Sequence, residues 1–176
     1  MSSKFVPDYT AERVLDIDFR RLASEGVKCV IFDADNTLLS YDETLPGEDI
    51  VSLCNELKSM GLYVCILSNG HSKRIKEIAR HLELEFIGDA LKPKKKGFRQ
   101  CTRQCGCTMN EAVVVGDQIF TDIWGARRAG CVSVLVTPIK LGNEPGFVKT
   151  KRVLEKLFRK SIRKNASVMR REEQNG

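Results

Sequence analysis

Short apolar runs alternate with amphipathic stretches over most of this chain. The apolar runs cover residues 27–32, 62–67, 84–87, 112–115 and 131–136. Helical spacing of apolar side chains covers roughly 47–60, 72–82 and 118–129, and a basic segment around 94–105 is also expected to be helical. Strands that alternate with helices imply βαβ units, a parallel sheet and helices on both of its faces. The sequence therefore predicts an α/β fold with a single doubly wound parallel sheet.

Length and composition are those of an ordinary soluble domain. The chain has 176 residues, of which 42% are hydrophobic and 30% are charged, which suits one domain with a full core. No apolar run approaches the length of about 20 residues that spans a bilayer. The first residues also lack the apolar stretch of a secretory signal. We therefore expect a cytoplasmic protein.

Positive charge is concentrated near the C-terminus. The net charge is +6, and residues 149–164 alone carry eight basic side chains against Glu155, a local charge of +7. The remaining chain is therefore nearly neutral. We expect two parts, a globular domain over residues 1–146 with an N-terminal extension over about 1–25, and a basic amphipathic helix and tail over 147–176.

The predicted C-terminal helix has an apolar face, formed by Leu154, Leu157, Phe158 and Ile162. This face can dock on the body of the protein, as terminal helices often do. It can also lie in the interface of an anionic membrane, where each basic residue contributes on the order of 1 kcal/mol. The sequence leaves both arrangements open.

Seven cysteines are present, an odd number that argues against a disulfide framework in a chain of this kind. Cys101, Cys105 and Cys107 form a C-x3-C-x-C pattern. That spacing differs from the usual C-x2-C knuckle, and no second pair or nearby histidine completes four ligands. The pattern favours ordinary reduced thiols over a soft-metal site.

Polar side chains that can take part in catalysis or ligand binding follow four of the predicted strands. They are Asp33, Asp35 and Thr37, then Ser68 and Asn69, then Lys92, and finally Asp117 and Asp122. Taken singly, each set is also what an ordinary turn contains. The carboxyl ends of parallel strands meet at one edge of a sheet, where such folds bind ligands. We therefore expect these side chains to gather in one site.

This collection of groups suits phosphoryl transfer. It offers a carboxylate nucleophile, a second carboxylate, a hydroxyl and an ammonium group, with further acids nearby. Mg²⁺ prefers carboxylate and carbonyl oxygens, and it can neutralise both a phosphate and an attacking carboxylate. Amide groups at the helix N-termini after these strands can bind phosphoryl oxygens. The expected cofactor is Mg²⁺ and the expected substrate is phosphorylated.

The order of these motifs resembles the haloacid dehalogenase (HAD) superfamily. D-x-D-x-T at Asp33, Asp35 and Thr37 precedes Ser68, Lys92 and the G-D-x4-D pattern of Gly116, Asp117 and Asp122. Within subfamily IIIA of that superfamily, the chain resembles the small bacterial phosphatases related to mitochondrial phosphatidylglycerophosphate phosphatase. The shared segments are D-A-D-N-T-L-L, L-S-N-G, A-L-K-P-x-K and V-V-G-D-Q-x-x-T-D-I-x-G-A. The resemblance implies a HAD-like, Rossmannoid fold and phosphatase activity.

The resemblance also implies roles in covalent catalysis and metal binding. Asp33 is expected to attack phosphorus and to bind Mg²⁺ with its other oxygen. Asp35 is expected to protonate the leaving oxygen, to take a proton from the hydrolytic water, and to bind the metal through its carbonyl. Asp117 is expected to bind Mg²⁺. For Asp122 three roles stay open, since it can bind the metal directly, bind it through water, or only support Lys92.

The remaining motif residues are implied to hold the phosphate. Thr37 is expected to form a hydrogen bond near the first loop. Ser68, with the backbone of Asn69, is expected to bind a phosphoryl oxygen, and Lys92 to neutralise charge on the nucleophile and the phosphate. Only 30 residues separate Thr37 from Ser68 and only 23 separate Ser68 from Lys92. Neither interval can hold an inserted cap domain, so an open site is expected.

Three functions compete at this stage. The family resemblance, the open site and the basic surface favour dephosphorylation of phosphatidylglycerophosphate to phosphatidylglycerol, with peripheral contact at the inner face of a membrane. A phosphatase for a soluble sugar phosphate or nucleotide is the alternative. A nucleic-acid or ribosome-binding role is disfavoured, because aromatic residues are not interleaved with the basic run at the density that such sites use.

Overall fold

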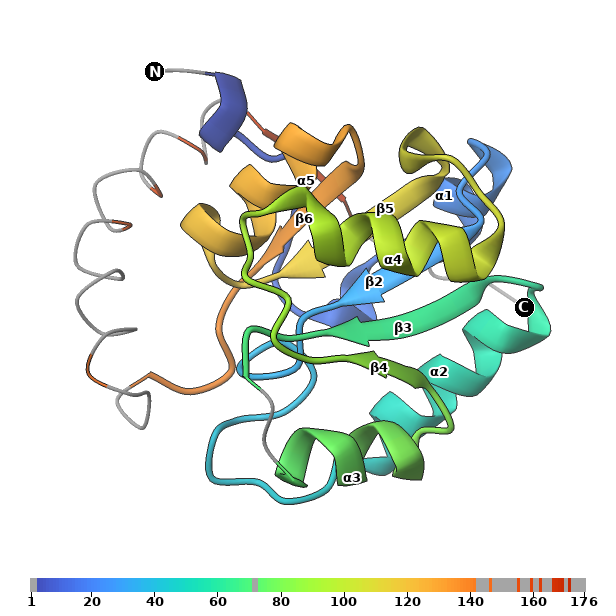
Figure 1. Ribbon diagram of the computed structural model, residues 1–176, viewed down its shortest axis with the longest axis vertical. Coiled ribbons are helices and arrows are strands. Elements are labelled where there is room, and N and C mark those ends of the chain that lie inside the picture. The colour runs from blue at the N-terminus through green and yellow to red at the C-terminus, as the bar shows by residue number, and fades with distance from the viewer. Residues whose placement is uncertain are drawn as a thin grey trace.

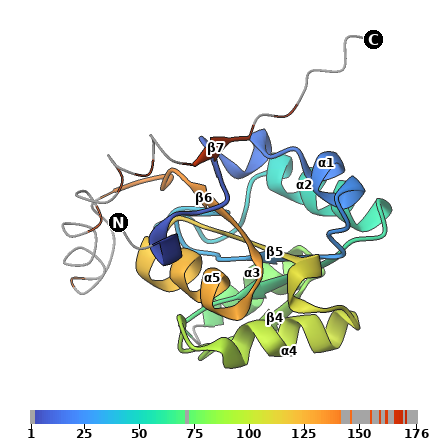
Figure 2. The ribbon, with the colours of Figure 1, turned by 90° about the horizontal axis from the view of Figure 1, so that it is seen from above.

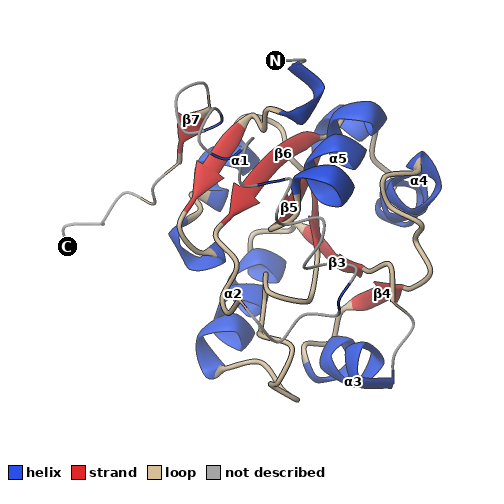
Figure 3. Cartoon of the chain, turned by 90° about the vertical axis from the view of Figure 1, so that its left-hand side faces the viewer, coloured by secondary structure: helices blue, strands red, loops and turns tan. Residues whose placement is uncertain are grey.

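The computed structural model describes residues 3–70 and 73–141, together with Gly146, Glu155, Arg159, Ile162, residues 166–169 and Arg171. Within this part of the chain, the strands form one seven-stranded parallel sheet in the order β4-β3-β2-β5-β6-β1-β7 (Figures 1 and 3). The strands are β1 (Tyr9–Ala11), β2 (Cys29–Phe32), β3 (Tyr63–Leu67), β4 (Glu85–Ile87), β5 (Ala112–Gly116), β6 (Val132–Val136) and β7 (Ser167–Val168). The predicted α/β class and parallel sheet are confirmed.

Helices cover both faces of this sheet. They are α1 (Phe19–Ser24), α2 (Glu48–Ser59), α3 (Lys73–His81), α4 (Lys95–Cys105) and α5 (Trp124–Ala129). Seen from above, α1 and α2 lie on one side of the sheet and α4 and α5 on the other (Figure 2). Buried residues of α3 share the core of α1 and α2. The fold is therefore three-layered and doubly wound.

Strand β2 shows how the sequence fills both layers. Its four residues are all fully buried. Successive side chains of a strand point to opposite faces, so Val30 and Phe32 pack in the core beneath α1 to α3, while Cys29 and Ile31 pack beneath α4. A central parallel strand therefore needs a continuous apolar run, as residues 27–32 provide.

The sequence analysis did not predict strands β1 and β7 or the π-helical turn after β5. Strands β1 and β7 have three and two residues, too few to show a period. The segment after β5 does not start as an α-helix. It opens with a π-helical turn, Ile119–Ile123, in which the Ile123 N–H donates to the Gln118 carbonyl at 3.3 Å. Only then does α5 begin, and Gly130 ends it in the left-handed conformation.

The described C-terminal residues contact the body at several places. Ile162 is fully buried against Ile119, Ile123 and Leu135, whereas Leu154, Leu157 and Phe158 of the predicted apolar face lie outside the described residues. Further on, β7 pairs with β1. Among the residues described there, the C-terminal segment thus packs on the protein rather than away from it.

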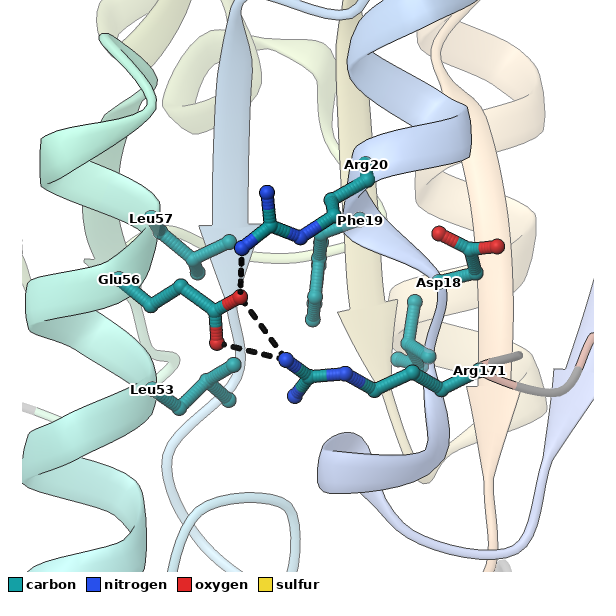
Figure 4. Close-up of a pocket in the computed structure, with 8 residues that line it drawn as sticks. Asp18, Phe19, Arg20, Leu53, Glu56, Leu57 and Arg171 are labelled. Carbon is teal, nitrogen blue, oxygen red and sulfur yellow. Dashed lines mark hydrogen bonds and ion pairs between the residues drawn. The ribbon is translucent and has the colours of Figure 1, made fainter. Parts of the chain in front are cut away.

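Arg171 adds a polar contact to this packing. Its backbone N–H donates to the Asp16 carbonyl at 2.8 Å. Its guanidinium binds Glu56 of α2, which also accepts a hydrogen bond from Arg20 of α1 (Figure 4). The small pocket that these side chains line lies between α1 and α2 and holds none of the predicted site residues.

The described part of the chain contains no cap domain. Between β2 and β3 lie a loop and α2, and between β3 and Lys92 the described residues form only α3, β4 and their connections. No described helix is long and apolar enough to cross a membrane.

We predict that Gly125→Ala destabilises the fold. A Cβ atom at this position would lie 2.7 Å from Cζ of Phe98 and 3.3 Å from the backbone Cα of Pro93. Phe98 is fully buried, so its ring has no free space to enter, and overpacking of this kind costs about 1–3 kcal/mol. Urea unfolding should show the loss. Gly146→Ala is the matched control, because no heavy atom of the described residues lies within 4 Å of its added Cβ. Equal stability of the two variants would contradict the prediction.

Candidate active site

A buried lysine joins two of the predicted carboxylates. Lys92 follows β4, and its Nζ lies 2.6 Å from Oδ1 of Asp33 and 2.7 Å from Oδ1 of Asp122. Asp33 follows β2 directly, and Asp122 lies in the π-helical turn after β5. All three side chains are at least nine-tenths buried. Residues that are 30 and 59 positions apart in the sequence thus meet at the carboxyl edge of the sheet.

Asp117 completes the cluster from the end of β5. One carboxylate oxygen from each of Asp33, Asp117 and Asp122 lies within 4.8 Å of the others. Gly116 makes room for this, because a Cβ there would come within 2.5 Å of the Asp122 carboxyl group. The Gln118 N–H donates to Oδ2 of Asp122 at 3.1 Å and fixes its orientation.

Burial and neighbouring charges shift the pKa of both ends of the central ion pair. Loss of water raises the pKa of Asp33 well above its usual range; Lys92 lowers it, and Asp122 and Asp117 raise it. Burial also opposes the charge on Lys92, but Asp122 and Asp33 outweigh this, and the net pKa of Lys92 is raised. Lys92 therefore stays protonated, while the carboxylates need more positive charge than one ammonium group supplies.

This donor set fits a divalent cation. Three carboxylates and one ammonium group leave a net charge of −2 when all are ionised. Oδ2 of Asp33 is buried and has no hydrogen-bond partner among the described residues, a costly state for a polar oxygen. Oxygen ligands of this kind are what Mg²⁺ prefers. A second group of close ligand atoms, from Cys29, Cys105 and Cys107, shares no residue with this set.

The loop after Asp33 is sharply bent. Asn36 adopts a positive φ of 62°, which Asn tolerates better than most residues, and its N–H donates to the Leu39 carbonyl at 2.7 Å. Thr37 is buried within this loop, and its hydroxyl has no partner among the described residues. The bend keeps Asp33, Asp35 and Thr37 close to the sheet edge.

Asp35 is held by a residue that the sequence analysis missed. Nη1 of Arg74, in α3, lies 2.6 Å from Oδ1 of Asp35. The same guanidinium donates to the carbonyls of Ser40 at 2.6 Å and Glu43 at 2.7 Å. Arg74 therefore fixes the position of Asp35 relative to the loop that carries it. Periodicity places Arg74 on a helix but gives no sign of this contact.

Ser68 and Asn69 follow β3. The Ser68 hydroxyl accepts a hydrogen bond from the Gly70 N–H at 3.1 Å. The Asn69 side chain binds the backbone of Lys92 on both sides, donating to its carbonyl at 3.2 Å and accepting from its N–H at 2.6 Å. The amide of Asn69 thus positions the segment that carries the buried ammonium group.

Two residues of the basic C-terminal run also reach this site. Oε1 of Glu155 accepts from the backbone N–H groups of Ile119 at 2.7 Å and Phe120 at 3.3 Å. Arg159 donates to the Asp117 carbonyl at 2.6 Å. Both contacts hold the backbone that presents Asp117 and Asp122. Glu155 carried a signal, as the one acid in the basic run, whereas the contact of Arg159 carried none.

Comparison with known proteins decides the family. The haloacid dehalogenase-like hydrolase family matches residues 39–130, more than half of the chain. The "Probable phosphatase YqeG" of Bacillus subtilis is 32% identical over 162 residues, which cover 89% of this chain and 93% of that protein. The chain belongs to the haloacid dehalogenase superfamily. It is a phosphatase of that superfamily, as the sequence predicted.

Other relatives of this HAD phosphatase have different stated substrates. "Phosphatidylglycerophosphate phosphatase 1, chloroplastic/mitochondrial" of Arabidopsis thaliana is 27% identical, over 90% of this chain and 49% of its own length. The chain therefore spans about half of that relative. "Glyceraldehyde 3-phosphate phosphatase" of Pyrococcus furiosus is 28% identical, over 72% of this chain and 54% of its own length.

Solved structures agree on the fold. The cobalt-bound deoxy-D-mannose-octulosonate 8-phosphate phosphatase of Haemophilus influenzae covers 80% of this chain and 91% of its own, with a TM-score of 0.53. A HAD phosphatase from Thermococcus onnurineus covers 75% and 98%, again with a TM-score of 0.53. Both are 18% identical in sequence. The core sheet of this HAD phosphatase is thus shared with proteins of distant sequence.

We predict that Arg74→Gln lowers the phosphatase kcat by roughly tenfold, about 1.4 kcal/mol of barrier. The change removes the ion pair to Asp35 and leaves that carboxylate free to turn away. Steady-state kinetics measures the effect. Arg80→Gln is the matched control, since it makes the same change at an exposed position of the same helix. A wild-type kcat in Arg74→Gln would show that Asp35 needs no such support.

Proposed function

We propose that this protein hydrolyses a phosphomonoester through an aspartyl-phosphate on Asp33. The buried Lys92–Asp33 pair carries the proposal. Lys92 occupies Oδ1 of Asp33, and Oδ2 is left without a partner among the described residues. A buried carboxylate that keeps one oxygen unengaged beside an ammonium group is suited to act as a nucleophile toward phosphorus.

Two chemical steps follow from the side chains present. In the first, a carboxylate oxygen of Asp33 forms a bond to phosphorus while the bond to the leaving oxygen breaks. Asp35, as the acid, gives its proton to that oxygen. In the second, water attacks the aspartyl-phosphate, Asp35 takes a proton from the water, and Asp33 is released with inorganic phosphate. General acid-base help of this kind contributes about 10²–10⁴ in rate.

The other residues would bind the phosphoryl oxygens and neutralise their charge during these steps. Lys92 would neutralise Asp33 and a phosphoryl oxygen, and Ser68, the Asn69 backbone and Thr37 would bind the remaining oxygens. Asp33, Asp117 and the Asp35 carbonyl would hold Mg²⁺, which supplies charge neutralisation of the phosphate. Both carboxylate oxygens of Asp122 already have partners, Lys92 and the Gln118 N–H. We therefore propose that Asp122 supports Lys92 and does not bind the metal directly.

We propose a phospholipid headgroup, phosphatidylglycerophosphate, as the substrate. Relatives named for this activity match 85–90% of the chain. The described residues contain no cap domain that would exclude a large substrate. The sequence over residues 149–164 carries a net charge of +7, which would favour binding to an anionic membrane surface. The proposed location is the cytoplasm, at the inner face of the membrane.

A soluble phosphomonoester is the second candidate. Archaeal glyceraldehyde 3-phosphate phosphatases are 26–28% identical over 70–72% of the chain. These identities resemble the 27% of the phosphatidylglycerophosphate phosphatases. The two classes share the reaction at phosphorus and differ in what surrounds the leaving group.

We predict that Asp33→Asn abolishes phosphate release while the protein stays folded, because an amide is a poor nucleophile and a weaker metal ligand. Asp35→Asn should lower kcat by about 10²–10⁴. Phosphate release and circular dichroism together measure activity and folding. Asp89→Asn, in the loop after β4, is the control carboxylate. More than trace activity in Asp33→Asn would exclude the covalent route.

We predict that Mg²⁺-dependent phosphate release is faster with phosphatidylglycerophosphate in mixed micelles than with glyceraldehyde 3-phosphate or nucleotide monophosphates. EDTA should stop turnover and Mg²⁺ should restore it, because the carboxylate cluster needs a cation to bind phosphate. A higher kcat/KM for a soluble monoester than for the lipid would show that the soluble compound is the preferred substrate. Activity that survives exhaustive chelation would contradict the metal requirement.

A further inference from the structure

Three cysteine sulfurs gather at the end of the sheet opposite the catalytic cluster. Cys29 is the first residue of β2, whose last residue precedes Asp33. Cys105 is the last residue of α4, and Cys107 follows two positions later. Their Sγ atoms all lie within 4.8 Å of one another. Cys29 is fully buried, whereas the other two are half-buried, so the cluster can be reached from the surface.

The end of α4 is shaped to bring two of these thiols together. Gly106 caps the helix with a φ of +74°, a left-handed conformation that favours glycine. The Cys107 N–H then donates to the Thr102 carbonyl at 3.0 Å. This reversal turns the thiols on either side of Gly106 toward Cys29. A sequence pattern alone shows Cys105 and Cys107 but not the third sulfur, which comes from a strand 76 positions earlier.

Lys28 and Glu111 lie beside this cluster. Lys28 acts electrostatically on Cys105 and Cys107, and its ammonium group lies 2.5 Å from Oε1 of Glu111. The Cys105 thiol donates a weak hydrogen bond to the Lys28 carbonyl, with 3.6 Å between Sγ and the oxygen. Burial and the nearby Glu111 raise the pKa of Cys105 and Cys107, so both stay thiols until a metal displaces the proton.

We propose that Cys29, Cys105 and Cys107 bind a soft, thiophilic metal ion of the Zn²⁺ or Cu⁺ class. Thiolates select such ions over Mg²⁺. At a zinc–sulfur distance of about 2.3 Å, sulfurs around one ion lie about 3.8 Å apart, so the three side chains need to close by about 1 Å or less. Each sulfur–metal bond forms as the thiol proton leaves for solvent, and no electron is transferred. Water takes the remaining position.

Such an ion would fasten the end of α4 to the central strand. The segment leading into α4 carries Lys92, but the cluster shares no residue with the carboxylates. Binding to the folded state alone raises stability by mass action. The site is therefore expected to stabilise the protein without taking part in phosphate release, and its existence does not depend on the proposed substrate.

The test uses Cd²⁺ as the probe, added to the full-length, fully reduced protein with excess Mg²⁺ present. We expect a thiolate-to-metal absorption band that saturates at one equivalent, and a rise in melting temperature. Cys105→Ser and Cys107→Ser should each weaken Cd²⁺ binding at least tenfold and keep wild-type phosphatase activity. Both positions are half-buried, so these variants should fold even if Cys29→Ser does not.

Cys54→Ser is the matched control, because Cys54 is a buried thiol of α2 on the other face of the sheet. It should bind Cd²⁺ as the wild type does. Absence of a thiolate band, or a band unchanged in Cys105→Ser and Cys107→Ser, would overturn the proposal. So would protein purified without reductant in which two of these cysteines form a disulfide, since the thiols would then pair with each other instead of with a metal.

Discussion

The site depends on one ammonium group that is buried between two carboxylates. Lys92 is almost fully removed from water, and so are its partners Asp33 and Asp122. Removing one member of such a buried pair costs about 3–5 kcal/mol, because the charge that remains is uncompensated. The ends of β2, β4 and β5 must therefore be placed together. Asn69 clamps the backbone of Lys92, and Gly116 leaves space for Asp122.

Much of this arrangement could be predicted because parallel strands end at a common edge. The apolar runs that become β2, β3, β5 and β6 are visible in the sequence. The position of the polar residues at the ends of these strands could therefore be predicted. β1 and β7 are too short to show a period. The contacts of Arg74 and Arg159 join segments that only the tertiary structure brings together, and no local pattern encodes them. Glu155 is distinguished in the sequence only as the one acid of the basic run.

The named relatives of this protein differ in their substrates. Relatives named for a lipid substrate and for a soluble one have similar identity to this chain, 27% and 28%, but cover 90% and 72% of it. We expect the choice between substrates to come from the surface around the sheet edge, where the described residues include no cap domain. Arg159, which donates to the Asp117 carbonyl, borders this edge.

The position of β1 has a consequence for how the chain folds. Tyr9 of β1 pairs with Val134 of β6 and with Ser167 of β7, so both neighbours of this strand are made more than a hundred residues after it. During synthesis β2, β3 and β4 can associate as they emerge, because their connections are short. β1 must wait with its backbone groups unpaired until the last third of the chain appears. Long-range pairing of this kind slows folding and exposes strand edges, so completion of the sheet at β1 is expected to be a late step.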